Sequence, residues 1–135
     1  MIMLDSTACI DYLNGIEAIK KVLSKKEQMT CTTTITVYEV NIGLERTKRK
    51  ISEKRYLDLY KKWMGFLSGV QIFSLGMKEA EQAAKIHDVL EAKGSMIDDN
   101  DILIAGIMEA NGITNMITRN AQHFEKIPGI EVSSY

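Results

Sequence analysis

The chain is poor in residues that interrupt a fold or build a thiolate metal site. It has one proline among 135 residues and no stretch rich in serine and glycine, so we expect no internal linker. Its two cysteines, Cys9 and Cys31, lie apart in apolar surroundings and lack the clustered spacing of a zinc site. We expect both to be buried reduced thiols. With no internal repeat or low-complexity tract, residues 1–135 are predicted to form a single domain with its own core.

Membrane-crossing and secretory segments are also missing from the sequence. No apolar run approaches the ~20 residues that a transmembrane helix requires. The N-terminal stretch M-I-M-L-D reaches Asp5 without the hydrophobic core of a signal peptide. These absences predict a protein without a membrane partner and with a cytoplasmic location.

Several common catalytic motifs are absent as well. The chain has no P-loop, no GxGxxG turn and no residues arranged like a Ser-His-Asp triad. Neither histidine resembles a soft-metal ligand. His87 falls on an alanine-lined helical stripe, where we expect a partly buried side chain, and His123 is expected to be structural. If the protein is an enzyme, acidic residues must therefore carry its chemistry.

What the sequence does contain is an alternation of short apolar runs with amphipathic segments. Strands are predicted over residues 2–4, 29–34, 70–75, 113–118 and 130–133. Helices are predicted after Asp5 to Leu13, over 16–26, from a capping box at Thr36 to about Arg46, after a cap at Ser52, over a stripe from Ala80 to Leu90, over 102–111 and from Asn120. This order favours an α/β domain with a largely parallel sheet covered on both faces.

Ligands of such sheets bind beyond the carboxyl ends of the strands. Asp5 follows the first predicted strand, and Thr118 to Asn120 follow the fourth. We therefore expect these residues to face one crevice. We expect the start of the helix before the fourth strand to face the same crevice.

That helix begins in an unusually acidic stretch, I-D-D-N-D-I-L-I-A-G, residues 97–106. Three carboxylates within four positions repel one another, and such clusters either take up protons or bind a cation. Oxygen-only ligand sets are typical of hard divalent ions such as Mg²⁺ and Mn²⁺. The cluster therefore indicates a cation site.

Each acid also has an ordinary structural explanation. Asp5 would serve as a helix N-cap, and Glu39 as the last residue of a capping box with Thr36. Acids at 98, 99 and 101 would favour the helix dipole by roughly 0.3–1 kcal/mol each. One acid would suffice to favour the helix dipole, so this explanation does not account for the presence of three.

The net charge of −1 conceals a segregation of charge. Residues 46–62 carry eight Lys and Arg against two acids, whereas residues from 76 onward carry five basic and ten acidic side chains. Tyr56, Tyr60 and Trp63 are interleaved with the basic run. It is a candidate surface for a polyanion, while a solvated helix face and aromatic packing are the alternatives.

Four stretches, in order and spanning nearly the whole chain, resemble the PIN-domain ribonucleases, most closely the VapC-type toxins of prokaryotic toxin–antitoxin pairs. They are M-L-D-S-T-A-C-I-D-Y-L (3–13), T-T-I-T-V-Y-E-V-N-I-G (33–43), G-S-M-I-D-D-N-D-I-L-I-A-G (94–106) and I-T-R-N-A-Q-H-F-E-K-I-P-G-I-E-V (117–132). The resemblance implies a three-layer α/β/α sandwich around a central, mainly parallel sheet. It also implies a cytoplasmic endoribonuclease that cleaves single-stranded RNA with one or two Mg²⁺ or Mn²⁺ ions.

The resemblance assigns residues by position. Asp5, Glu39 and Asp101 would be the catalytic, metal-binding carboxylates, and Asn120 would be a neutral further ligand where the family often has aspartate. Supporting roles fall to Asp98, Ser6 and Thr118, which would act through water or phosphate. Positive charge, and not the resemblance, predicts that Arg119 beside the site and Arg46, Lys48, Arg49 and Lys50 in the basic run contact the RNA. The implied partners are a cognate antitoxin and a second copy of the chain.

Three other functions stay open from the sequence. One is a PIN-like module that binds RNA or a protein without cutting, for which the uncharged Asn120 leaves room. Another is a housekeeping RNA-processing nuclease. The last is phosphoryl transfer with Asp5 as nucleophile, although such enzymes usually have a second aspartate where Thr7 stands.

Overall fold

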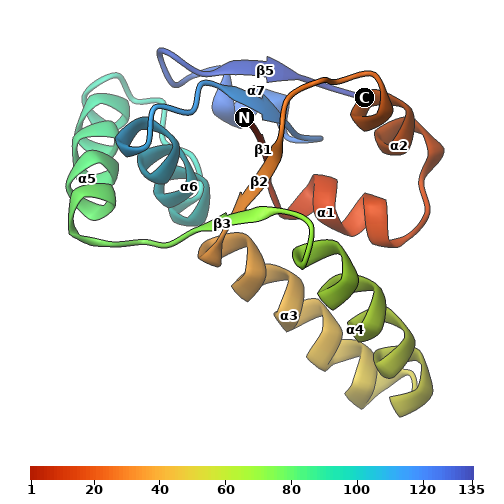
Figure 1. Ribbon diagram of the computed structural model, residues 1–135. Coiled ribbons are helices and arrows are strands. Elements are labelled where there is room, and N and C mark those ends of the chain that lie inside the picture. The colour runs from red at the N-terminus through yellow and green to blue at the C-terminus, as the bar shows by residue number, and fades with distance from the viewer.

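The computed structural model describes all residues from 1 to 135, and in it strands and helices alternate as expected (Figure 1). The strands are β1 (Ile2–Leu4), β2 (Thr30–Thr33), β3 (Gln71–Phe73), β4 (Asn115–Ile117) and β5 (Glu131–Ser133). The helices are α1 (Ser6–Leu13), α2 (Glu17–Ser24), α3 (Thr34–Lys50), α4 (Glu53–Leu67), α5 (Met77–Ala92), α6 (Asp99–Ala110) and α7 (Ala121–Phe124). Every strand lies inside its predicted range.

The five strands form one parallel sheet in the order β3-β2-β1-β4-β5. Met3 of β1 is in register with Cys31 of β2 on one side and with Met116 of β4 on the other. The chain first builds the sheet outward from β1 through β2 to β3, and then returns to add β4 and β5 at the other side. The strand order therefore reverses between β1 and β4, which is where parallel sheets form a ligand crevice.

Alternation along the strands gives the sheet two separate cores. Ile2 and Leu4 pack with α1 to α4, whereas Met3 between them packs with α5 and α6 on the other face. Figure 1 shows these two groups of helices on either side of the sheet. The predicted three-layer α/β/α sandwich is confirmed.

The prediction for the start of α3 is wrong. The helix begins at Thr34, and its N-cap is Thr33, whose side-chain oxygen accepts a hydrogen bond from the backbone N–H of Thr36 at 3.1 Å. Each threonine of the run T-T-T-I-T can cap a helix. The one chosen directly follows the pairing of β2, because the chain turns at once from strand to helix. Glu39 is therefore not part of a capping box.

Helices α3 and α4 form a hairpin that extends away from the sheet (Figure 1). Helix α3 runs to Lys50, one turn beyond the predicted end, while the predicted cap of α4 is confirmed, since Ser52 accepts from the N–H of Arg55 at 3.0 Å. Trp63 is fully buried and stacks on Phe66 with 5.6 Å between ring centroids. Aromatic packing is thus the correct explanation for Trp63.

Two smaller expectations concern the cysteines and the membrane. Cys9 and Cys31 are both free and buried, as predicted. Burial raises the pKa of the Cys31 thiol to about 11, so it is protonated at neutral pH. None of the helices is both long and apolar enough to cross a bilayer.

Candidate active site

Asp5 stands where β1 ends and α1 begins, and it is 1% exposed. Its Oδ1 accepts hydrogen bonds from the N–H of Ala8 at 3.1 Å and from the Thr7 hydroxyl at 2.7 Å. Its Oδ2 accepts from the Thr118 hydroxyl at 2.5 Å, which joins the carboxyl ends of β1 and β4. The capping explanation for Asp5 is therefore correct for one oxygen only. Burial raises the pKa of Asp5, and the three hydrogen bonds oppose that rise.

Glu39 lies in the second turn of α3, where the early start of the helix leaves its side chain free of any capping role. Its Oε1 is buried and has no hydrogen-bond partner. Burial raises the pKa of Glu39, while Ser6 and Asn100 beside it act in the opposite direction. An unpaired buried carboxylate oxygen is costly to a fold. It marks a position where a positive charge from outside the chain would be stabilising.

Asp101 lies in the first turn of α6 and is 7% exposed. Its Oδ2 is 2.7 Å from Nδ1 of His123 in α7. Asp98 precedes the helix at the N-cap position but makes no capping hydrogen bond, and ligand atoms of Asp98, Asp101 and His123 all lie within 4.8 Å of one another. Burial raises the pKa of Asp101, which the neighbouring His123 opposes and the Asp98 charge supports. Asp99 is exposed and does not belong to this group.

Asp5, Glu39 and Asp101 come from the end of β1, the second turn of α3 and the first turn of α6, and they lie close enough for their charges to interact as one acidic cluster. The negative charge of Asp101 raises the pKa of both other carboxyls, and the charge of Asp5 adds to the rise at Glu39. Such mutual repulsion is relieved by a proton or by a cation. Asp98, which lies one turn before Asp101, borders the same cluster.

This cluster fits a hard divalent cation. Its donors are carboxylate oxygens, its charges are not neutralised by a lysine or arginine, and the buried Glu39 oxygen lacks a partner. The sequence predicts that Asp5, Glu39 and Asp101 hold the ion, and the ligand atoms that already lie within 4.8 Å of one another are those of Asp98, Asp101 and His123. Asn120 is the N-cap residue of α7, and its N–H donates to the Thr118 hydroxyl at 2.9 Å, so the predicted neutral ligand lies one hydrogen bond from the residue that binds Asp5.

His123 is the residue of this site that the sequence reasoning missed. The sequence predicts a structural role for it, yet its ring contacts the third acid directly. Only the position of α7 against the start of α6 creates that contact, and a single sequence carries no signal for it.

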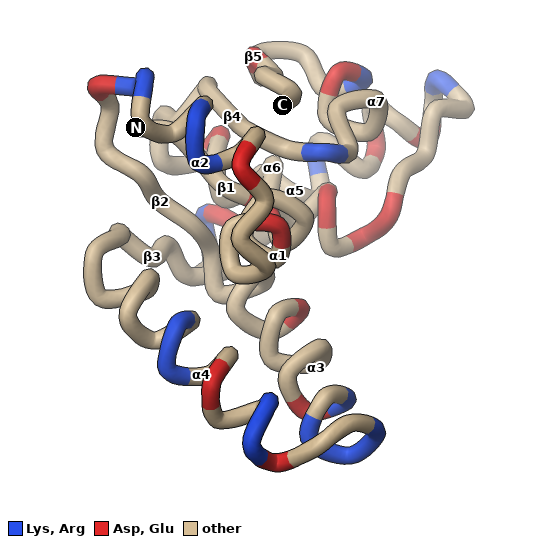
Figure 2. The backbone as a smooth tube through the Cα atoms, turned by 90° about the vertical axis from the view of Figure 1, so that its right-hand side faces the viewer, with Lys and Arg blue, Asp and Glu red and all other residues tan.

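The predicted RNA-binding residues fall into two places. The backbone of Arg119 is held beside the site, because its N–H donates to the Thr7 hydroxyl at 3.0 Å. Arg46, Lys48, Arg49 and Lys50 lie ~10–17 Å beyond Glu39 along the axis of α3, from a rise of ~1.5 Å per residue. Figure 2 shows these positive charges at the far end of the hairpin. The structure thus separates them from the acids.

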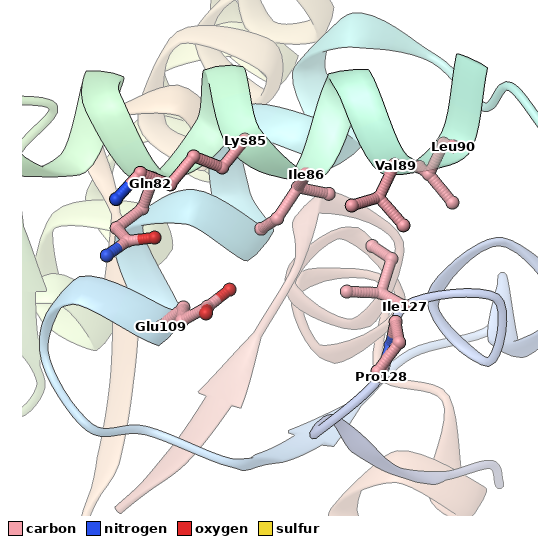
Figure 3. Close-up of a pocket in the computed structure, with 8 residues that line it drawn as sticks. All are labelled: Gln82, Lys85, Ile86, Val89, Leu90, Glu109, Ile127 and Pro128. Atoms are coloured by element: carbon pink, nitrogen blue, oxygen red, sulfur yellow. The ribbon is translucent and has the colours of Figure 1, made fainter. Parts of the chain in front are cut away.

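A cavity of about 240 Å³ elsewhere in the molecule is no part of this site. Figure 3 shows it between α5, the last turn of α6 and the segment after α7, with Ile86, Val89 and Ile127 among its lining residues. Glu109 at its edge lies ~12 Å further along α6 than Asp101. The volume is below the ~300 Å³ of a small ligand pocket, and no cluster of titratable groups converges in it.

Comparison with known proteins agrees with this architecture. The chain is similar to the tRNA(fMet)-specific endonuclease VapC of Salmonella typhimurium, with 28% identity over 98% of this chain and 96% of the relative. It is 27% identical to Ribonuclease VapC2 of Rickettsia felis over the same shares of the two chains. Its fold is similar to the crystal structure of VapBC2 from Rickettsia felis bound to a DNA fragment from their promoter, with a TM-score of 0.83 and 25% identity over 100% of this chain and 99% of that one. The PIN domain profile matches residues 2–130, and the chain therefore belongs to the PIN-domain family.

Proposed function

We propose that this chain is a VapC-type endoribonuclease that hydrolyses phosphodiester bonds of single-stranded RNA in the cytoplasm with the help of Mg²⁺ or Mn²⁺. The observation that carries the proposal is the cluster of Asp5, Glu39 and Asp101, in which one buried carboxylate oxygen has no partner. The names of the relatives support the reaction, because an endonuclease and a ribonuclease match nearly the whole chain at 28% and 27% identity.

The residues of the chain have separate tasks in this proposal. Thr7 and Thr118 fix the Asp5 carboxylate by hydrogen bonds, so that its charge is presented in one orientation. His123 does the same for Asp101. When bound, a divalent ion supplies Lewis acidity and positive charge at the scissile phosphodiester. Ser6, which is beside Glu39, and Asn120, which is bonded to Thr118, would orient water or phosphate at the edge of the cluster.

A nucleophilic role for Asp5 is disfavoured by its surroundings. Both of its oxygens accept hydrogen bonds, three in all, and the residue is 1% exposed. A carboxylate so fully paired and enclosed is suited to hold charge in place, and an attacking group must be free to reach phosphorus. Hydrolysis by activated water therefore fits the site better than a phosphoaspartate does.

We further propose that the chain is the toxin of a toxin–antitoxin pair and pairs with a second copy of itself. The fold neighbour from Rickettsia felis is a VapBC2 assembly, matched over the whole of this chain. A short reading frame for an antitoxin beside the gene would separate this role from housekeeping RNA processing. Co-expression of the two products, followed by size-exclusion chromatography with light scattering, measures both partnerships.

The proposed activity is tested by cleavage of labelled single-stranded RNA and of tRNA in EDTA, Mg²⁺ or Mn²⁺. Wild type is compared with Asp101→Asn and with the matched control Asp99→Asn, an exposed acid two residues away that lies outside the cluster. We expect cation-dependent cutting that is lost in Asp101→Asn and retained in Asp99→Asn.

Two outcomes would contradict the proposal in different ways. Cutting that survives Asp101→Asn would point to a contaminating nuclease or to other ligands. RNA binding without cutting by any variant would favour the PIN module that binds without hydrolysis, which is the alternative that the uncharged Asn120 suggests.

A further inference from the structure

A further buried carboxylate lies next to the acidic cluster but is not part of it. Asp11 in α1 is 6% exposed, and both of its oxygens are paired with residues from the far end of the chain. Its Oδ1 accepts from Nη1 of Arg119 at 3.1 Å, and its Oδ2 accepts from the Tyr135 hydroxyl at 2.6 Å. The cation site makes no use of this carboxylate.

Arg119 is held at both of its ends by one face of α1. Its backbone N–H donates to the Thr7 hydroxyl, and its guanidinium donates to Asp11, four residues further along the helix. Residues four apart lie above one another on a helix surface, so Thr7 and Asp11 form a two-point mount. The Thr7 hydroxyl in turn donates to Asp5 at 2.7 Å, so the backbone of Arg119 is one hydroxyl away from the cluster.

The arginine keeps most of its binding capacity in this mount. A guanidinium has five N–H donors in a planar fork, and Asp11 accepts from Nη1 alone. The Arg119 side chain is 60% exposed, whereas that of Asp11 is 9% exposed. One edge of the fork is thus fixed against the protein while the rest faces solvent, which is the arrangement that suits a phosphate.

We propose that Asp11 is a positioning residue that holds the Arg119 guanidinium at the rim of the acidic cluster, where it binds a phosphate of the RNA strand. The inference rests on the proposed function and names the group that draws a polyanion to a negatively charged site. Tyr135 fixes the second oxygen of Asp11, and so keeps the first one directed at the arginine. Burial and the Asp11 carboxylate both raise the pKa of Tyr135, so its hydroxyl stays a donor at neutral pH.

The proposal is tested by comparing the RNA affinities of two variants that change the net charge equally. Asp11→Asn and Asp88→Asn each remove one negative charge, but Asp88 is an exposed acid on α5, which packs on the opposite face of the sheet from α1. Net charge alone predicts that both variants bind RNA slightly more tightly. The proposal predicts that Asp11→Asn binds more weakly, because an uncharged amide holds the guanidinium less firmly than the carboxylate does.

Binding is measured by fluorescence anisotropy of a labelled single-stranded RNA in EDTA over a series of salt concentrations. Arg119→Gln is expected to make the slope of log K against log [salt] less negative by ~0.7, the value for one phosphate contact on a single strand. In cleavage assays, Arg119→Gln and Asp11→Asn should each raise KM about tenfold and leave kcat nearly unchanged. The double variant should be no worse than either single one, because both act through one contact.

Conservative variants separate positioning from a structural ion pair. Asp11→Glu should recover part of the lost affinity, and Arg119→Lys, which keeps the charge without the fork, should recover little. Unchanged binding and KM in Asp11→Asn, or tighter binding equal to that of Asp88→Asn, would overturn the proposal. If Asp11→Asn does not fold, Arg119→Lys against Arg119→Gln still tests the role of the arginine, and Tyr135→Phe tests the mount, with a smaller rise in KM expected.

Failure of the proposed function is visible separately. If the wild type does not cleave RNA, the function fails, while the salt slopes in EDTA still report on Arg119 and Asp11. If the wild type cleaves and the Asp11 variants do so with an unaltered KM, the positioning role fails and the function stands.

Discussion

The two halves of the candidate site are built in different ways. The strand-end half consists of Asp5, Thr7 and Thr118, where every carboxylate oxygen accepts a hydrogen bond from within the chain. The helix half consists of Glu39, Asp98, Asp101 and His123, where one buried oxygen has no partner and His123 is the one group that can offset the negative charge. In the strand-end half the fold itself supplies a partner for every carboxylate oxygen. In the helix half the unpaired oxygen and the excess negative charge require a positive group from outside the chain.

This difference separates the residues that hold the geometry from those that hold a ligand. Removing a donor from the strand-end half leaves a buried acceptor unpaired, which destabilises the protein. Removing a charge from the helix half relieves repulsion, which stabilises the cation-free protein while it weakens the cation site. Stability and activity are therefore expected to respond together in one half and in opposite directions in the other.

The largest effect is expected for Glu39→Gln. This substitution keeps the shape of the side chain but removes the charge beside the unpaired oxygen. Cleavage of RNA should fall by at least about a hundredfold, the upper end of the loss for a residue that merely supports a metal ligand. The free energy of unfolding in EDTA should rise by about 0.5–2 kcal/mol, which is typical when a strained functional site is relaxed.

Initial rates of cleavage with Mg²⁺ or Mn²⁺ check the loss of activity, and denaturant unfolding in EDTA checks the gain in stability. The control is Glu45→Gln, which removes an exposed charge two turns further along α3 and should change neither quantity appreciably. A Glu39→Gln protein that is both inactive and less stable would place Glu39 with the structural residues.

Cation binding should have the next largest effect, and it should depend on the helix half. A cation that binds the native state alone stabilises it by ~2.7 kcal/mol when present at one hundred times its Kd. We expect Mn²⁺ or Mg²⁺ to raise the Tm of the wild type and to have little effect on Asp101→Asn. Differential scanning fluorimetry over a cation titration measures this, and the same buffer with EDTA gives the baseline. Equal shifts in wild type and Asp101→Asn would mean that the ion binds elsewhere.

Thr118→Val tests the strand-end half. The substitution removes the donor to Oδ2 of Asp5 and the acceptor of the Asn120 N–H, both in a fully buried position. We expect a loss of about 1–3 kcal/mol in the free energy of unfolding together with lower activity. Thr118→Ser, which retains the hydroxyl, should recover most of both. Urea unfolding and cleavage rates are measured side by side. A Thr118→Val protein that lost activity without losing stability would contradict the assignment of Thr118 to the strand-end half.

The sequence predicted the strand-end half better than the helix half, for a physical reason. Asp5 and Thr118 each follow a strand, and the crevice rule for parallel sheets places such residues together once the strands are recognised. The strands themselves can be recognised because each is a short apolar run between turn signals, and all five lie inside their predicted ranges.

The helix half depends on packing that no local pattern encodes. The capping box at Thr36 is a sound local pattern, but any of four neighbouring threonines could be the N-cap of α3. The end of β2 determines which one is used, and it is Thr33. The contact from His123 to Asp101 and the pairing of Arg119 with Asp11 join residues 22 and 108 positions apart. Likewise, α4 follows its predicted cap at Ser52, but the sequence does not show which of its large side chains is buried. Leu57, Tyr60 and Met64 are 40–47% exposed, and Trp63 is the buried one.

The smallest expected effect is the pH dependence that the two halves share. Burial raises the pKa of Asp5, Glu39 and Asp101 above the ordinary values of 3.8 for Asp and 4.5 for Glu. The native state therefore retains protons that the unfolded chain has released. The stability that these groups contribute is fully present below the ordinary values and is lost as the pH rises through the raised pKa values of the native state.

A bound cation takes the place of those protons, so its stabilising effect should grow as the pH rises. We expect the difference in Tm between saturating Mg²⁺ and EDTA to widen from about pH 4.5 toward neutrality, since affinity for carboxylates requires their deprotonated form. Taking the difference cancels titration elsewhere in the molecule. Glu39→Gln should show a flatter increase, because one of the three titrating groups is gone. A gap that is constant with pH, or that narrows, would mean that the acids are already ionised in the cation-free protein and that repulsion is relieved by some other group.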